Sequence, residues 1–403
     1  MLTALDIGTS KVAVIVGDVV GDDIEIRSVG SCLSNGMKKG VVINIEEMVD
    51  SIRRAVEEAE LMAECKVSSV YVGVAGSHIQ SLNCHGAAPI RDGEVSRADI
   101  ANAIETAQAI QIAGDQQVLH VLPRDFTIDG EQGIKDPIGM SGYRLEATVH
   151  LITGGAHPIQ NIAKCVRRCG LEVESFVLEP IASSLAVLTP DERELGVCLV
   201  DIGGGTTDIA VFTRGAVVHT AVIPIAGDHV TNDIAVTLRT PTKSAEEIKL
   251  KYGFALKRCA DESETVEVPG LSAERPATRI RRQMLAEIIE PRYEELFSLV
   301  RRELERHHFG DVVVSGIVLT GGSAKLEGVA ELAESVFQMP VRIGRPAAVE
   351  GFPSISRDPV HATGLGLLRY AADMGSGGDA EQLRGGRLKN IWLRAKAWLQ
   401  ENF

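Results

Sequence analysis

The chain has 403 residues, of which 45% are hydrophobic, enough for two or three domains with sizeable cores. Its net charge of −14 excludes general nucleic-acid binding, because such binding needs a basic footprint. No stretch reaches the about 20 consecutive apolar residues of a membrane-spanning helix. Asp6 and Lys11 interrupt any N-terminal secretion signal, and seven scattered cysteines without a CxxC pair are typical of reduced cytosolic thiols.

The first motif is Asp6-Ile7-Gly8-Thr9-Ser10-Lys11, which precedes an apolar run at 12–16. This order predicts a strand, a tight glycine turn and a second strand. Only five residues precede Asp6, so we expect a short first strand. A glycine turn exposes backbone N–H groups with no Cβ in the way, so anionic oxygens can approach closely. Gly8, Thr9 and Ser10 are therefore candidate phosphate ligands, and Lys11 is long enough to reach terminal phosphates.

The next part of the chain predicts strands with one helix, Ile45 to Met62, up to about residue 83. The pattern then changes between about 84 and 165, which indicates a compact inserted module. Its expected elements are a helix at 97–111, a strand at 118–128, a Pro/Gly loop at 136–142 and a strand at 144–153.

Glu179 stands directly before Pro180, at a predicted helix start. Hydrolysis of a bound phosphate ester needs an oriented water, and Glu179 is the best polar candidate for that catalytic role. The alternative is an acid that is simply favoured by the helix dipole.

The second motif repeats Asp-Ile-Gly within Val200-Asp201-Ile202-Gly203-Gly204-Gly205-Thr206-Thr207-Asp208. Apolar runs flank it, so a second hairpin is predicted. Its candidate phosphate ligands are Gly203, Gly204, Gly205, Thr206 and Thr207. A carboxylate repels a phosphate unless a hard divalent cation lies between them. Asp6 and Asp201 therefore predict Mg²⁺ held through water, and Asp208 is a third candidate.

Two helices and a third glycine turn follow. A helix is predicted at 245–253, and a long helical pattern at 279–308 carries Arg279, Arg281, Arg282 and Arg292. Residues 312–320 are typical of a buried strand, and 325–337 of a helix. Gly321, Gly322 and Ser323 lie between them, where glycines let a flat ring or a ribose lie against the backbone.

The C-terminal end differs from the rest of the chain. Glycines and polar residues at 374–386 are typical of a flexible linker. On a helical wheel, the apolar side chains of 387–403 gather on one face and basic ones lie outside it, as in a helix in a membrane interface. The alternative is a helix packed on its own domain. The predicted membrane contacts are Leu388, Ile391, Trp392, Lys396, Trp398, Leu399 and Phe403.

The three glycine motifs, in this order, resemble the superfamily of actin, heat-shock chaperone ATPases and sugar kinases. The motifs at 30–32, 36–40, 136–142 and 286–293, together with the tail, are similar to the FtsA family of bacterial cell-division proteins. The resemblance implies an actin-like ATPase fold: two α/β domains with ATP and Mg²⁺ in the cleft between them, and an inserted subdomain in each.

The resemblance also implies how the chain is divided, with two hinge helices near 179–184 and 362–367. The expected parts are subdomain 1A (1–83, 166–195 and 361–373), inserted subdomain 1C (84–165), subdomain 2A (196–227 and 311–360), subdomain 2B (228–310), the linker (374–386) and the membrane-targeting helix (387–403).

By the same resemblance, Glu246 and Lys249 would contact the ribose and adenine. A surface i,i+3 ion pair explains them equally well. Subdomain 2B would bind the C-terminal peptide of the tubulin-like protein FtsZ through Arg281, Arg282 and Arg292. A solvated charged face is the alternative for these arginines.

The implied function is an ATP-binding protein that forms filaments and tethers FtsZ to anionic lipid on the cytoplasmic face of the bacterial inner membrane. Subdomain 1C would recruit later division proteins. No pocket for a second substrate can be identified, so at most weak ATPase activity is expected. The alternatives are a small-molecule kinase or chaperone ATPase of the same fold, and a pilus-assembly type of actin homologue.

Overall fold

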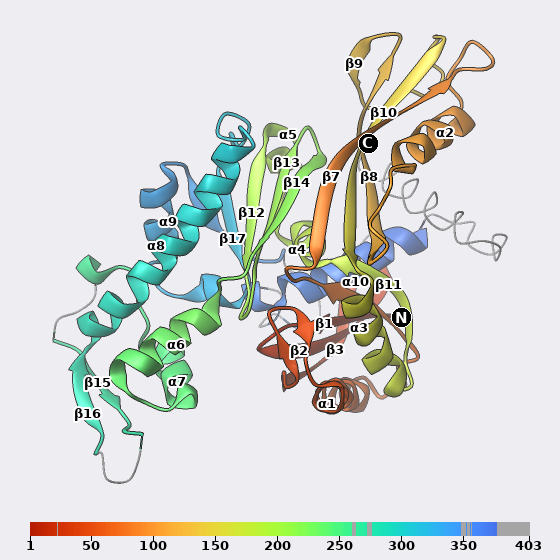
Figure 1. Cartoon of the computed structure of the whole chain (residues 1–403). Coiled ribbons are helices and arrows are strands. Elements are labelled where there is room, and N and C mark those ends of the chain that lie inside the picture. Colours follow the sequence, from red (N-terminus) through yellow and green to blue (C-terminus); the bar gives the residue numbers. More distant parts are fainter. Residues whose placement is uncertain are drawn as a thin grey trace.

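The computed structural model describes residues 1–21, 23–259, 263–271, 276–347, 352, 355 and 357–376. The described residues form two α/β domains, and a further sheet is inserted into the first (Figure 1). The membrane contacts predicted at Leu388, Ile391, Trp392, Lys396, Trp398, Leu399 and Phe403 lie outside the described residues.

The first domain is built on a five-stranded sheet in the order β11-β6-β1-β2-β3. Its strands are β1 (Leu2–Ile7), β2 (Lys11–Val20), β3 (Asp23–Leu33), β6 (Ser69–Val74) and β11 (Glu172–Leu178). The short strands β4 (Met37–Lys38) and β5 (Val41–Val42) form a separate pair. The helices of this domain are α1 (Ile45–Ala63), α3 (Ala156–Arg168), α4 (Glu179–Val187), α5 (Pro190–Leu195) and α10 (Ala362–Ser376).

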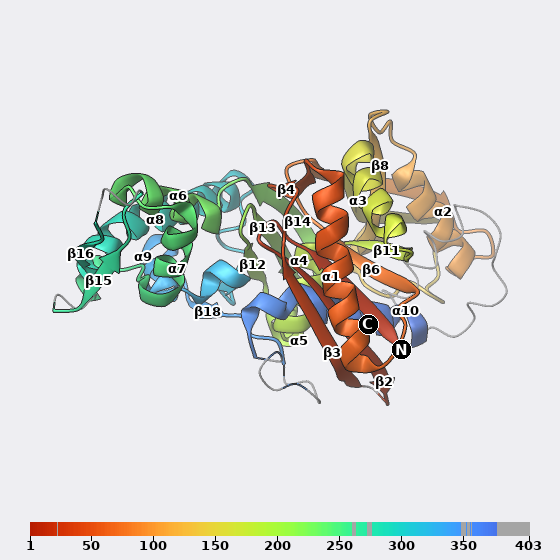
Figure 2. The same ribbon diagram turned by 90° about the horizontal axis from the view of Figure 1, so that it is seen from below.

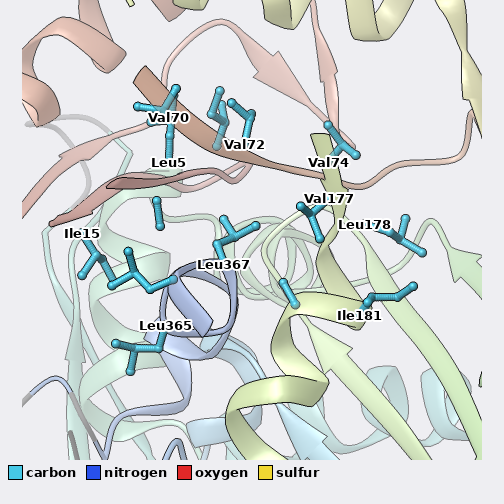
Figure 3. Close-up of a cluster of buried hydrophobic side chains, with 14 of the residues drawn as sticks. Leu5, Ile15, Val70, Val72, Val74, Val177, Leu178, Ile181, Leu365 and Leu367 are labelled. Carbon is cyan, nitrogen blue, oxygen red and sulfur yellow. The ribbon is translucent and has the colours of Figure 1, made fainter. Parts of the chain in front are cut away.

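Helices cover both faces of this sheet. α1 packs against β3 at Gly30, where a Cβ would lie 2.6 Å from the backbone nitrogen of Ala59, and α3 lies beside α1 (Figure 2). On the other face, Leu365 and Leu367 of α10 and Ile181 of α4 meet apolar side chains of the sheet (Figure 3). This buried core fixes the ends of β1 and β6 against the two hinge helices.

The two hinge helices cross at very short range. A Cβ on Gly366 of α10 would overlap the carbonyl oxygen of Ala182 in α4. Small residues in both segments therefore allow the crossing, and α10 runs through Ser376, beyond the predicted start of the linker at residue 374.

The inserted unit is a four-stranded sheet in the order β7-β10-β8-β9, covered by α2 (Figure 1). Its elements are β7 (Ile79–Pro89), α2 (Arg97–Gln108), β8 (Gln116–Ile128), β9 (Glu131–Ile134) and β10 (Arg144–Gly155). α2 ends three residues before the predicted 111, because its last turn tightens and Ala109 N–H donates to Thr106 O at 3.2 Å rather than continuing the helix.

The second domain is built on a sheet in the order β14-β13-β12-β17-β18. Its strands are β12 (Val197–Ile202), β13 (Thr207–Thr213), β14 (Ala216–Ile223), β17 (Ile317–Thr320) and β18 (Val341–Ile343). Outside this sheet lie α6 (Gly227–Leu238), α7 (Thr242–Tyr252), β15 (Thr265–Val268), β16 (Thr278–Arg281), α8 (Arg282–Arg306) and α9 (Val329–Phe337). Short 3₁₀ helices are found at Lys257–Cys259, Gly322–Lys325 and Pro359–His361.

Three predicted elements of this domain were too long. The strand predicted at 312–320 begins only at Ile317, because Gly316 has a positive φ of 80° and turns the chain. The long helix begins at Arg282, since 278–281 pair with β15 as a strand. The helix predicted at 325–337 begins at Val329, because Gly328 has a φ of 82°.

None of the helices within the described ranges combines the length and the apolar character that crossing a membrane requires.

Candidate functional site

The two Asp-Ile-Gly motifs form hairpin turns of the same geometry. In the first, Gly8 N–H donates to Lys11 O at 2.9 Å, and Ile7 pairs with Val12 across the hairpin. In the second, the N–H of Gly203 donates to Thr206 O at 3.0 Å, where Ile202 pairs with Thr207. One turn belongs to each domain, so the fold presents two equivalent glycine turns.

The two turns touch each other across the domain boundary. A Cβ on Gly204 would overlap the Oγ of Ser10, and one on Gly205 would lie 2.5 Å from the Oγ1 of Thr9. Ser10 Oγ in turn donates to Asp228 Oδ1 at 3.4 Å. Any side chain larger than glycine at 204 or 205 would push the two turns apart.

Buried carboxylates lie at the strand ends beneath these turns. Asp6, Asp201 and Asp208 are at most 8% exposed, and Asp201 pairs with Asp208 across the second hairpin. The Oδ2 of Asp201 accepts hydrogen bonds from Ser183 of α4 at 2.5 Å and from Thr363 of α10 at 3.4 Å. Both hinge helices therefore hold this carboxylate.

The pKa values of these acids are displaced upward. Burial raises the pKa of Asp201 to about 6, against the hydrogen bond from Ser183, and raises the pKa of Asp208 to about 7, with a further contribution from Asp201. Burial also raises the pKa of Asp6, which nearby Lys11 opposes. The region carries more negative charge than its protein neighbours balance.

Divalent cations fit this donor set. Asp208 Oδ2 accepts from Thr206 at 3.0 Å, whereas its Oδ1 is buried without a hydrogen-bond partner among the described residues. Carboxylate oxygens are the ligands that Mg²⁺ takes up, directly or through its waters. Such a cation would give the unpartnered oxygen a ligand partner and would lower the raised pKa values of these acids.

Glu179 faces the same carboxylates from the start of α4. It is half-buried, and burial raises its pKa well above the ordinary value, with contributions from Asp6, Asp208 and Asp201. A Cβ on Gly73 would lie 3.3 Å from Glu179 Cγ. The side chain thus belongs to the acidic group beneath the turns.

The third glycine turn closes against the second hairpin. Gly321 has a φ of 86°, and a Cβ there would lie 2.6 Å from Ile202 O and would overlap Asp201 Oδ1. Ser323 Oγ donates to Gly203 O at 2.8 Å. Gly322 is more open, since a Cβ there would approach only Val360, at 3.7 Å.

Glu246 and Lys249 lie beside this third turn. Lys249 Nζ is 2.7 Å from Glu246 Oε2 and donates to Thr231 Oγ1 at 2.8 Å and to Gly227 O at 3.1 Å. A Cβ on Gly227 would overlap Ser323 Oγ. The i,i+3 ion pair exists, but Lys249 is only 7% exposed, so it is not a pair on an open surface.

Two predicted phosphate ligands have partners within the protein. Lys11 Nζ donates to Val360 O at 3.2 Å and lies 3.5 Å from His361 Nδ1. Thr207 is fully buried and donates to Ile225 O at 2.8 Å. In this arrangement Thr207 holds the loop that leads to α6.

The three arginines predicted to bind a partner differ in their surroundings. Arg282 donates to Glu264 at 3.0 Å and to Glu327 at 2.9 Å, and Arg292 donates to Asp233 at 2.7 and 3.1 Å. These ion pairs tie together elements of the second domain. Arg281 is exposed at the end of β16.

The sequence reasoning missed several residues of the site. Ser183 and Thr363 were not predicted as site residues, although their hydroxyl groups were the available signal. Tyr293 is the last residue of the 286–293 motif, and its hydroxyl donates to Ser323 O at 2.8 Å, which supports the third turn. Burial raises the pKa of Tyr293, so this hydroxyl stays protonated and able to donate.

The fold is that of the actin-like ATPases. A chain of the PilM–PilN type IV pilus biogenesis complex is similar, with a TM-score of 0.65 and 18% identity, covering 91% of this chain and 97% of that one. MreB 5 of Spiroplasma citri bound to AMPPNP is similar with a TM-score of 0.58 and 16% identity, covering 93% of this chain and 97% of that one. At these identities the likeness concerns the fold alone.

Sequence comparisons are more specific. The family model "Cell division protein FtsA" matches residues 198–366, and "SHS2 domain inserted in FTSA" matches 76–153. The chain is 53% identical over 410 residues to "Cell division protein FtsA" of Pseudomonas aeruginosa, covering 100% of this chain and 98% of that protein. It is 45% identical to the Escherichia coli K12 protein over 417 residues, with the same coverage. The chain belongs to the FtsA family of cell-division proteins.

Proposed function

We propose that the chain binds ATP with Mg²⁺ between its two domains and uses the nucleotide to set the state of a division filament. The observation that carries this proposal is the direct contact of two glycine turns from different domains above buried strand-end carboxylates. A ligand held by both turns would link the domains, so its presence would change the equilibrium between arrangements of the two domains.

Each part of the site has a role in this proposal. The turns at 8–11 and 203–207 would bind phosphate oxygens, and Asp6 and Asp201 would hold Mg²⁺ through water. Mg²⁺, when bound, would neutralise phosphate charge. Gly321, Gly322 and Ser323 would lie against the adenosine, with Glu246 and Lys249 beside it. The structure of MreB 5 bound to AMPPNP, which shares the fold, supports this choice of ligand.

Hydrolysis, in this proposal, is weak. Glu179 is the candidate that orients the attacking water, and burial, together with Asp6, Asp208 and Asp201, raises its pKa above the ordinary value, which makes its carboxylate a stronger base. The acids around it restrict that role until a cation balances their charge.

The output of the nucleotide site would be a filament at the membrane. Self-association is supported by the fold shared with the chain of the "MamK double helical filament" (TM-score 0.52). The basic, apolar-faced segment 387–403 would bind anionic lipid on the cytoplasmic face of the inner membrane at the division site. Family membership supports a place in cell division.

Two further partners complete the proposal. The second domain would bind the C-terminal peptide of FtsZ, with Arg281 as the exposed cation and Arg282 and Arg292 shaping the surface around it. The inserted unit at 84–165 would recruit later division proteins.

Nucleotide binding is tested with Asp201→Ala and the control Asp191→Ala, an exposed acid at the start of α5. We expect Asp201→Ala to abolish Mg²⁺-dependent ATP binding in calorimetry and the control to bind normally. Retained affinity in Asp201→Ala would refute the metal assignment.

Membrane tethering is tested by sedimentation with anionic liposomes. We expect the full chain to sediment with vesicles and a chain lacking 387–403 to remain in the supernatant. A variant with Trp392 and Trp398 replaced by alanine keeps the charge and separates apolar insertion from attraction by the basic residues. Equal sedimentation of all three proteins would contradict the tether.

A further inference from the structure

A histidine–glutamate–histidine cluster lies in the second domain, away from the glycine turns. His219 of β14 and Glu303 of α8 approach within 3.0 Å (Nε2 to Oε1), and His307 Nε2 lies 3.2 Å from the same Glu303 oxygen. The nitrogen and oxygen atoms that the three side chains offer all lie within 4.8 Å of one another. Three groups that commonly bind transition metals therefore converge on one point.

Local structure fixes where each group lies. His219 is held in β14, where it pairs with Val211 of β13. Glu303 lies in the last turn of α8 and His307, four residues further on, is the C-cap residue of that helix, so both lie at the same helix end. Phe309 packs against both rings, with centroids 5.4 Å from His219 and 6.0 Å from His307. The rings are thus backed by an apolar side chain; His219 is partly buried, whereas His307 is exposed.

We propose that His219, Glu303 and His307 form a binding site for a divalent transition-metal ion such as Zn²⁺. Two imidazoles and one carboxylate are a known zinc ligand set, and they leave one position for water. Ligand atoms around a tetrahedral Zn²⁺ are about 3.3 Å apart, given metal–ligand bonds of about 2.0–2.1 Å. The 3.0 and 3.2 Å separations of the two histidine nitrogens from Glu303 are close to this value, and all three ligand atoms lie within 4.8 Å of one another.

The surroundings suit a soft or borderline metal better than Mg²⁺. Imidazole nitrogens favour zinc, copper, nickel and iron, whereas Mg²⁺ prefers oxygen ligands. The cluster and the carboxylates beneath the glycine turns would therefore take up different ions.

A metal at this place would join parts that are far apart in sequence. His219 and Glu303 are separated by 84 residues, and β14 is the edge strand of its sheet. The ion would fasten this edge strand to the C-terminal end of α8, which contacts it (Figure 1). Binding to the folded form alone raises thermal stability.

The site is tested with full-length protein that has no polyhistidine tag and has been freed of metals with a chelator. Zn²⁺ is titrated by calorimetry in buffer containing excess Mg²⁺, which occupies oxygen sites. Co²⁺ serves as a spectroscopic probe, because its absorption distinguishes nitrogen and oxygen ligands from thiolates such as the exposed Cys259. The variants are His307→Ala and Glu303→Gln, with His157→Ala, an exposed histidine on α3, as the matched control.

We expect one Zn²⁺ to bind per chain and the unfolding temperature to rise with Zn²⁺. In both cluster variants the Zn²⁺ affinity should fall roughly tenfold or more. The control should bind like the unchanged chain. His307 is exposed and Glu303→Gln keeps the side-chain shape, so both variants should fold. The proposal is overturned if Zn²⁺ does not bind, if all variants bind equally, or if the Co²⁺ spectrum reports thiolate ligands; the cluster would then be a hydrogen-bonded group only.

Discussion

Replacing Asp208 with asparagine should make the nucleotide-free protein more stable at neutral pH and impair its site. Asp208 is 3% exposed, and its Oδ1 has no hydrogen-bond partner within the described ranges. Asparagine has nearly the same shape without the charge. The hydroxyl of Thr206, which donates to Asp208 Oδ2, can donate to the amide oxygen instead.

The magnitude follows from the pKa. The pKa of Asp208 is raised from 3.8 to about 7, and each unit corresponds to about 1.4 kcal/mol. The full shift gives an upper bound of about 4 kcal/mol, and relaxation around neighbouring Asp201 reduces it, so we expect about 1–3 kcal/mol. Between about pH 4 and pH 7 the folded protein holds a proton that the unfolded chain has lost. Stability therefore falls as the pH rises through this window, and the penalty is complete above it.

The assay is urea or thermal unfolding of the nucleotide-free protein across pH 4 to 8, for the unchanged chain, Asp208→Asn and the exposed control Asp191→Asn. The stabilising effect of Asp208→Asn should be greatest near pH 8 and shrink toward pH 4, and Mg²⁺-dependent ATP affinity should fall about tenfold or more. The prediction is refuted if Asp208→Asn is less stable than the unchanged chain at pH 8, or if its effect does not depend on pH. In either case the charged Asp208 carboxylate does not destabilise the folded protein.

Other substitutions test the turns, the hinge and the arginines. Gly321→Ala should destabilise the protein and weaken ATP binding, because the methyl group would overlap Asp201 Oδ1 and approach the backbone of Ile202 at a residue whose φ is 86°; unchanged affinity in a fluorescent-nucleotide titration would contradict this. Gly366→Val should destabilise the protein by more than about 2 kcal/mol, measured by urea unfolding, since even a Cβ would overlap the backbone of α4. Arg292→Gln should cost about 1 kcal/mol through loss of its ion pairs, whereas exposed Arg281→Gln should change stability by less than about 0.5 kcal/mol; equal effects would show that the pairs are not stabilising.

The local features of the site could be predicted because glycine and aspartate at a strand end restrict the backbone to a few turn structures. A glycine turn after an apolar run allows few structures, so both hairpins at 6–11 and 201–208 were expected and are found. The same reasoning overextended the helix at 325–337, because a single glycine at 328 breaks an otherwise regular apolar pattern.

Contacts between distant segments could not be predicted from local pattern. Nothing near Ser183 or Thr363 shows that both would donate to Asp201, since that depends on how two hinge helices cross. The overlap that a Cβ on Gly204 would make with Ser10 likewise depends on the relative position of two domains. Such contacts are set by tertiary packing, which a single sequence does not specify residue by residue.

The edge strands β7 and β14 meet through side chains rather than through a backbone ladder. From β7, Ser81 donates to Thr220 O at 3.0 Å and Asn83 donates to Val218 O at 3.2 Å; from the neighbouring strand β10, His150 Nε2 lies 3.2 Å from Thr220 Oγ1. The last of these contacts is insensitive to ordinary changes of pH, since burial lowers the pKa of His150 to about 3.

β14 pairs with β13, which leads directly out of the second glycine turn. A rotation of the second domain that separates β14 from the inserted sheet must break these three hydrogen bonds, at about 0.5–1.5 kcal/mol each. The three hydrogen bonds together therefore reduce the population of such separated conformations by a factor of roughly 10 to 10³. The inserted sheet is thus coupled to the domain that carries the second turn strongly enough to follow its movement, yet weakly enough to be released by a single tightly bound ligand.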